Sequence, residues 1–251
     1  MIVKKTYLLF IIVFANLTGI TSQNTQKKTY KNYIENEQVI SENKLDTHAS
    51  FSSFTSEDTA IHSINEFKQI LDGIWKFNWV RDPKDRPQNF MIPTEDVSSW
   101  SNIKVPANWE VEGFGVPIYV NHQYEFADYK APVAEDIEFV NNVPKHPGKV
   151  PNNYNPVGSY RRDFNITPNW DGKQIFLHIG AMKSGGFVWI NGVYVGYSQG
   201  SKLPAEFDIT KVVKPGKNTI AIQIFRWTDG SYLECQDFWR ISGIERSVFI
   251  Y

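Results

Sequence analysis

Short runs of hydrophobic residues, several of them alternating with polar ones, fill the chain from residue 71 onward. In Ile74–Trp79 every second residue is aromatic, so Trp75, Phe77 and Trp79 share one face, as in a β-strand. Comparable runs follow at residues 103–105, 159–166, 173–179, 187–190, 193–195, 207–209, 219–225 and 247–251. Asn191-Gly192, between two of these runs, is typical of a type I′ hairpin turn. The pattern predicts an all-β fold, an antiparallel β-sandwich built from short strands.

The strand pattern is absent before residue 71. Lys4 and Lys5 precede an apolar stretch from Tyr7 to Leu17, and small polar residues follow, which predicts a signal peptide over residues 1–22. The protein is then secreted or periplasmic, with no membrane span after signal removal; an N-terminal membrane anchor is the alternative. Residues 23–47 are rich in polar side chains and predict a flexible lead-in. Ser56, followed by acidic residues, predicts a short helix or irregular arm within 56–70.

Residues 106–157 interrupt the strands. Prolines recur from Pro106 to Pro156 and exclude long regular elements. The same stretch contains too many aromatic residues for a disordered linker. It predicts a folded loop region, rich in proline and aromatic residues, that shapes a site.

Composition excludes several classes of function. The chain has 251 residues, a formal net charge of -1 and no long basic run, which argues against nucleic-acid binding. Cys235 is the only cysteine, so an internal disulfide and a cysteine-based zinc site are excluded. The five histidines are scattered without ligand-like spacing, so no histidine metal site is expected.

The stretch from Arg226 to Arg246 places tryptophans, a tyrosine, arginines and carboxylates around glycines. Flat aromatic faces beside charged hydrogen-bond groups are typical of a sugar site. Glu234 and Asp237 have three interpretations: a hydrolytic carboxylate pair, a Glu234 ion pair with Arg226 or Arg240, or one carboxylate that binds a sugar hydroxyl or a cation.

Other polar residues are weaker candidates. Asn121 offers both a donor and an acceptor to a sugar hydroxyl, but it also suits a turn. Arg161, Arg162 and Arg240 are expected to pair with carboxylates rather than to act on substrate. Ser198 and Ser201 have no acid or base at a recognisable spacing, so no nucleophilic triad is predicted.

Several motifs occur in an order that resembles a known family. They are Leu71–Phe77, Val105–Trp109, Pro117–Asn121, Asn155–Tyr160, Trp189–Tyr197, Ser201–Asp208, Arg226–Glu234 and Gln236–Gly243. Together they resemble the N-terminal sugar-binding domain of the large β-galactosidases of glycoside hydrolase family 2, over residues 48–251.

The resemblance implies a jelly-roll sandwich that sits against a separate (β/α)8 barrel. In the family the barrel supplies the catalytic glutamates and a magnesium site; nothing in this chain matches them, so no catalytic residue is assigned. Asn121 and Asp237 match residues that reach from the jelly roll into the active site and bind substrate. Asp237 also matches a partial sodium site, and Cys235 is given no role.

The expected function is therefore hydrolysis of terminal β-D-galactosides, with this chain supplying only the sugar-binding domain and being inactive alone. The expected partners are galactose or a β-galactoside and the catalytic barrel. The family also includes β-glucuronidases and β-mannosidases, but Gln236–Arg240 favours the galactosidase branch. A fragment or split gene product is expected; the alternatives are a standalone, non-enzymatic carbohydrate-binding module and a remnant that binds nothing.

Overall fold

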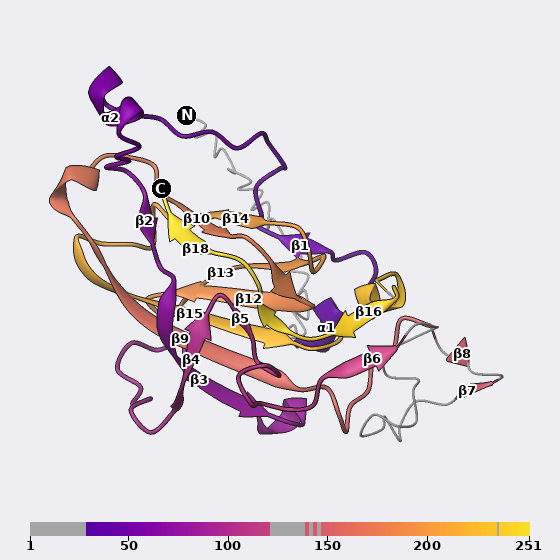
Figure 1. The fold of residues 1–251 in the computed structure, drawn as a ribbon. Helices are drawn as coiled ribbons and strands as arrows, with labels where there is room; N and C mark the ends of the chain where they lie inside the picture. The colour runs from indigo at the N-terminus through magenta and orange to yellow at the C-terminus, as the bar shows by residue number, and fades with distance from the viewer. Residues whose placement is uncertain (1–28, 121–138, 141–142, 145–146, 235) are drawn as a thin grey trace, which may run out of the picture.

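The computed structural model describes residues 29–120, 139–140, 143–144, 147–234 and 236–251. They form an antiparallel β-sandwich, which confirms the predicted fold class (Figure 1). The larger sheet has seven strands in the order β1 (Ser41–Glu42), β13 (Val193–Gln199), β12 (Gly185–Ile190), β15 (Gly216–Phe225), β9 (Val157–Ile166), β3 (Gly73–Val80) and β4 (Ser101–Val105). A four-stranded sheet has the order β14 (Ala205–Asp208), β10 (Phe176–Ile179), β18 (Val248–Ile250) and β2 (Gln69–Ile70).

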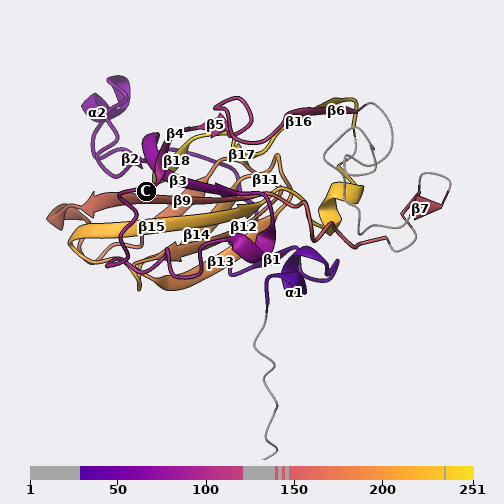
Figure 2. The same cartoon turned by 90° about the horizontal axis from the view of Figure 1, so that it is seen from below.

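Smaller sheets complete the fold. One has the order β11 (Met182–Lys183), β17 (Gly243–Ile244) and β5 (Ala107–Asn108). Two-stranded sheets pair β16 (Phe238–Arg240) with β6 (Ile118–Val120) and β7 (Phe139–Val140) with β8 (Val143–Pro144). The helical elements are α1 (Lys31–Ile34), α2 (Glu57–Ile61) and the 3-10 turns η1 (Pro83–Asp85), η2 (Pro168–Trp170) and η3 (Asp229–Tyr232). In both views β6 and β16 lie together at one end of the sandwich and α2 lies at the other (Figure 1, Figure 2).

The predicted strands coincide with the observed ones because their apolar positions fill the space between the sheets. Trp75 and Phe77 of β3 are buried with Tyr160 of β9, whereas Ile74 is exposed and Lys76 is half-buried. The Asn191-Gly192 turn joins β12 to β13, and both residues have positive φ, 53° and 83°, as a type I′ turn requires.

The structure describes the predicted flexible lead-in, residues 23–47, from residue 29 onward, and this part makes contacts with the sandwich. Residues of α1 pack on the sheet: Tyr33 and Ile34 are buried, and the Tyr33 ring lies 5.1 Å from those of Phe187 and Tyr197. Further along, β1 pairs with β13, Ser41 opposite Ser198. Two apolar anchors and a strand pairing therefore outweigh the polar composition of this arm.

Two further predictions concern loops. The short helix expected within 56–70 is confirmed as α2, where the Ser56 hydroxyl accepts a hydrogen bond from the Thr59 amide at 3.2 Å. The described parts of 106–157 are folded, with Trp109 and Tyr154 buried. The signal peptide proposed for residues 1–22 and the Asn121 site lie outside the described residues.

Candidate functional site

The β6–β16 ribbon carries the residue that the sequence singled out, Asp237. Its register places Trp239 opposite Tyr119 and Arg240 opposite Ile118. Burial alternates along it: Arg240 and Ile118 are buried, whereas Trp239 and Tyr119 are about half exposed, at 56% and 50%. The ribbon therefore presents an aromatic face outward and anchors itself by the opposite face.

Asp237 stands at the start of this ribbon and is exposed. One of its carboxylate oxygens, Oδ1, accepts a hydrogen bond from the Tyr119 hydroxyl. That hydrogen bond, with some desolvation and the negative charge of Asp237, raises the pKa of the Tyr119 phenol. Asn121 follows Val120 in the chain but lies outside the described residues, so the expected meeting of Asn121 with Asp237 stays a prediction.

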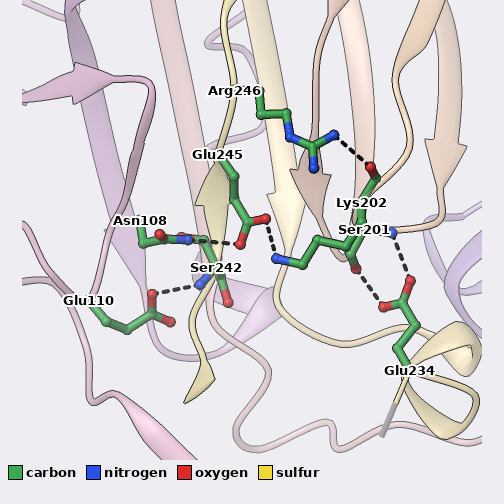
Figure 3. A network of polar contacts seen from close by, with 8 residues as sticks. All are labelled: Asn108, Glu110, Ser201, Lys202, Glu234, Ser242, Glu245 and Arg246. Carbon is green, nitrogen blue, oxygen red and sulfur yellow. Dashed lines mark hydrogen bonds and ion pairs between the residues drawn. The ribbon is translucent and has the colours of Figure 1, made fainter. Parts of the chain in front are cut away.

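The loop before Asp237 is held from two sides. The carboxylate of Glu234 accepts hydrogen bonds from the Ser201 amide at 2.7 Å and the Ser201 hydroxyl at 2.5 Å (Figure 3). The buried guanidinium of Arg240 donates to the Glu234 carbonyl at 2.6 Å and to the Gln236 carbonyl. Charge-assisted hydrogen bonds of this kind hold the backbone of the loop firmly. They therefore fix the position of Asp237 at the start of the ribbon.

Below the ribbon lies a buried ion pair between Arg226 and Glu110. Both side chains are fully buried and their charged atoms are 3.5 Å apart. Glu110 also accepts hydrogen bonds from the Trp109 indole at 2.6 Å and the Ser242 amide at 2.7 Å. Burial raises the pKa of the Glu110 carboxyl, although Arg226 and these hydrogen bonds oppose that shift.

Arg226 connects this pair to the ribbon. Its guanidinium donates to the Val116 carbonyl at 3.1 Å and to the Arg240 carbonyl at 2.9 Å. Val116 precedes β6 and Arg240 ends β16, so one buried cation ties the two strands to the sandwich.

A second polar network runs beside the first. Glu245 accepts hydrogen bonds from Asn108 at 3.0 Å and from Lys202, while Arg246 donates to the Lys202 carbonyl at 3.0 Å (Figure 3). These contacts join the turn that carries Ser201 and Lys202 to the segment after β17. The turn that holds Glu234 is thus itself fixed in place.

The structure corrects two expectations about charged partners. Arg161 donates to the carbonyls of Phe90, Pro93 and Glu95 rather than to carboxylates. Arg162 donates to the carbonyls of Leu71 and Asp72. Both guanidiniums donate to backbone carbonyls of loop residues, and sequence spacing does not reveal such partners.

The carboxylate of Glu234 does not form the ion pair with Arg226 or Arg240 that was one of its three interpretations. It binds Ser201, and Arg240 binds its carbonyl instead. The Glu234 carboxylate therefore stabilises its own loop, whereas the Asp237 carboxylate is exposed to solvent.

Within the described part of the chain, no three His, Cys, Asp or Glu side chains are gathered in a way that would hold a metal ion. A surface hollow of about 350 Å³ lies beside His48, His178 and Glu206, on the four-stranded sheet and not at Asp237. The described helices include none that is long and apolar enough to span a bilayer.

Sequence reasoning missed Tyr119 and Glu110. The signal for Tyr119 was present, because it lies two residues before Asn121 in the motif Pro117–Asn121. Nothing local marks Glu110, whose partner Arg226 is far along the chain and becomes a neighbour only in the folded sandwich.

The fold and the ribbon define a β-sandwich module that carries an exposed carboxylate and exposed aromatic rings at one end. The sequence profile described as "Glycosyl hydrolases family 2, sugar binding domain" matches residues 68–251. The chain belongs to this family, and these residues are its sugar-binding domain.

Curated relatives agree. The chain is 35% identical over 225 residues to a protein named beta-galactosidase from Priestia megaterium. This alignment covers 88% of this chain and 20% of the relative. It is 37% identical over 215 residues to the beta-galactosidase of Psychromonas ingrahamii, covering 85% of this chain and 19% of the relative. The chain thus spans about one fifth of these relatives. The first alignment is longer than residues 68–251, so the likeness reaches into the N-terminal arm.

Solved structures show the same fold at lower identity. A beta-glucuronidase from Bacteroides uniformis superposes with a TM-score of 0.51 and 22% identity, covering 73% of this chain and 17% of that one. At this identity the likeness concerns the fold alone.

Proposed function

We propose that this chain is the sugar-binding domain of a β-galactosidase and takes part in the hydrolysis of terminal β-D-galactosides. The relatives named beta-galactosidase, which match most of the chain at 35% and 37% identity, support this substrate class. The observation that carries the proposal is the exposed Asp237 carboxylate on a ribbon anchored by buried charges. An exposed carboxylate on a rigid support suits recognition of sugar hydroxyls.

In this proposal Asp237 accepts hydrogen bonds from galactose hydroxyls, and Asn121 contributes a second polar contact. The other carboxylate oxygen of Asp237, Oδ2, would also be one ligand of a sodium ion, whose positive charge would help to fix a sugar hydroxyl. A single carboxylate is a partial site, so other oxygen ligands must come from elsewhere. The catalytic glutamates and any magnesium site belong to the catalytic barrel, and this chain alone is expected to be inactive.

The first experiment measures turnover of a chromogenic β-galactoside by the purified chain. No hydrolysis is expected, and hydrolysis by the chain alone would overturn the assignment of its role. The second experiment measures binding of methyl β-galactoside, methyl β-glucoside and methyl β-glucuronide by saturation-transfer NMR. Weak binding that favours the galactoside is expected, and a preference for the glucuronide would refute the substrate class.

The matched variants are Asp237→Asn and Asp85→Asn. Asp237→Asn removes the carboxylate charge and should abolish the preference for galactoside. Asp85 is exposed on η1 and belongs to neither strand of the ribbon, so Asp85→Asn should bind like the unsubstituted chain. If both variants lost the preference for galactoside equally, Asp237 would have no specific role in sugar binding.

Export rests on residues 1–22, and we propose cleavage after this segment. The N-terminal sequence of the protein recovered from the periplasm or medium tests it; an intact first residue would contradict it.

A further inference from the structure

One tryptophan of this chain stands apart by its exposure. All eight tryptophans lie among the described residues, and seven of them are buried or half-buried. Trp239 is exposed at 56%, and its cross-strand partner Tyr119 is exposed at 50%. Together they form an exposed aromatic patch beside a carboxylate, and apolar patches rimmed by polar groups are typical of binding sites.

The two rings lie on the same face of the ribbon as the Asp237 carboxylate. Their centroids are 5.6 Å apart with planes inclined by 59°. Asp237 lies two residues before Trp239, so it falls on the same side of the strand line, and the Tyr119 hydroxyl reaches it directly. An indole, a phenol and a carboxylate thus form one small surface.

We propose that Trp239 and Tyr119 form a platform for the apolar C–H face of a pyranose ring whose hydroxyls donate to Asp237. This inference rests on the proposed function and deepens it, since it names the residues that contact the sugar ring. Tyr119 has two tasks: its ring extends the platform, and its hydroxyl holds Oδ1 of Asp237, which leaves Oδ2 for the ligand.

The carboxylate decides between a sugar and an apolar protein surface as the occupant. Covering Trp239 with apolar side chains would also desolvate Asp237, and an ionised carboxylate without a donor is costly to bury. Tyr119 is its only hydrogen-bond partner among the described residues. A pyranose offers both a C–H face and several hydroxyl donors, so it satisfies the rings and the carboxylate together.

The experiment uses tryptophan fluorescence of the chain, with acrylamide as quencher and methyl β-galactoside as ligand. Trp239 should account for most of the accessible fluorescence, so Trp239→Phe should remove most of the quenching. Galactoside should protect the unsubstituted chain from acrylamide. The control Trp100→Phe, at a half-buried tryptophan stacked on Phe90, should leave that protection unchanged.

Affinity is measured in parallel by saturation-transfer NMR. Trp239→Ala should weaken galactoside binding about tenfold, because a lost aromatic stack and its area are worth roughly one factor of ten. Trp239→Phe should keep most of the affinity. Tyr119→Phe keeps the ring but removes the hydrogen bond from the Tyr119 hydroxyl to Asp237. It should weaken binding by about threefold and reduce the preference for galactoside.

The outcomes separate the inference from the proposed function. If the unsubstituted chain prefers galactoside and Trp239→Ala binds equally well, the platform is refuted and the proposed function stands. If the unsubstituted chain binds no galactoside, both fail. If Trp239 becomes protected as protein concentration rises without sugar, the surface is a contact between protein chains and the platform is refuted.

Discussion

The buried pair of Arg226 and Glu110 gives the sharpest test of how the ribbon is supported. Arg226→Met keeps a long apolar side chain and removes the guanidinium, which leaves Glu110 as an uncompensated buried charge. Breaking a buried ion pair costs about 3–5 kcal/mol. Two carbonyls, of Val116 and Arg240, also lose their donor, at about 1–3 kcal/mol each before relaxation. We expect a total near 5 kcal/mol after overlap, a large part of the stability of an ordinary domain.

The second variant tests whether the two charges act as a pair. Glu110→Gln keeps an acceptor for Trp109 or Ser242 but leaves Arg226 unpaired, and should cost about 3 kcal/mol. The double variant contains no buried charge at this position, so it should cost at least about 2 kcal/mol less than the sum of the two.

The pH dependence gives an independent check on the same pair. The pKa of Glu110 is already raised above its ordinary value of 4.5, and loss of Arg226 raises it further. When the pKa of a carboxyl is higher in the folded than in the unfolded chain, the free energy of unfolding falls as the pH rises above the unfolded-state pKa. The cost of Arg226→Met should therefore be larger at pH 7 than at pH 4.

Urea unfolding, followed by circular dichroism, measures these free energies. Arg81→Met is the control, because Arg81 lies 4.0 Å from Asp82 at the surface and should cost below about 1 kcal/mol. The reasoning is refuted if Arg226→Met costs as little as that control, or if the costs of the two single variants simply add.

Three further predictions concern other parts of the fold. A Cβ at Gly158 would lie 2.4 Å from the ring of Trp109, so Gly158→Ala should cost about 1–3 kcal/mol in urea unfolding; an unchanged midpoint would contradict this. Tyr33→Ala should free the N-terminal arm, costing up to about 3 kcal/mol, and trypsin should then cleave at Lys44 while the sandwich survives; equal resistance would count against it. His48 lies 2.5 Å from Glu206. Hydrogen bonds to Ala49 and then to Glu206 raise the pKa of His48. Burial alone would raise the pKa of Glu206, but its hydrogen bonds from His178 and His48 lower it. The contact is therefore strongest between about pH 4.5 and 6.5 and weakens as pH rises through the His48 pKa. An NMR titration of His48 should show a midpoint above 6.5 that returns toward 6.5 in Glu206→Gln; a midpoint at or below 6.5 would refute it.

The strand positions could be predicted because each sheet face imposes a period of two on its own sequence. Ile74–Trp79 and the Asn191-Gly192 hairpin carry that information locally, and the structure confirms both. The exposed position of Asp237 also agrees with a residue that faces a ligand, although its role stays a prediction.

The partners of the buried charges could not be predicted in the same way. Arg161 binds carbonyls 66–71 residues away, and Glu234 binds Ser201, 33 residues away. Such contacts depend on which loops cross in the folded chain, and backbone carbonyls look alike in every sequence. The contacts of the arm are hard to foresee for a related reason: only two buried apolar residues, Tyr33 and Ile34, anchor it within an otherwise polar stretch.

The pairing of β1 with β13 has a consequence for solubility. β13 is flanked by β12 on one side and by only two residues of the arm on the other. Without those residues, the free backbone amides and carbonyls of β13 would offer a template for strands of other molecules. The arm therefore shields an edge that would otherwise favour aggregation.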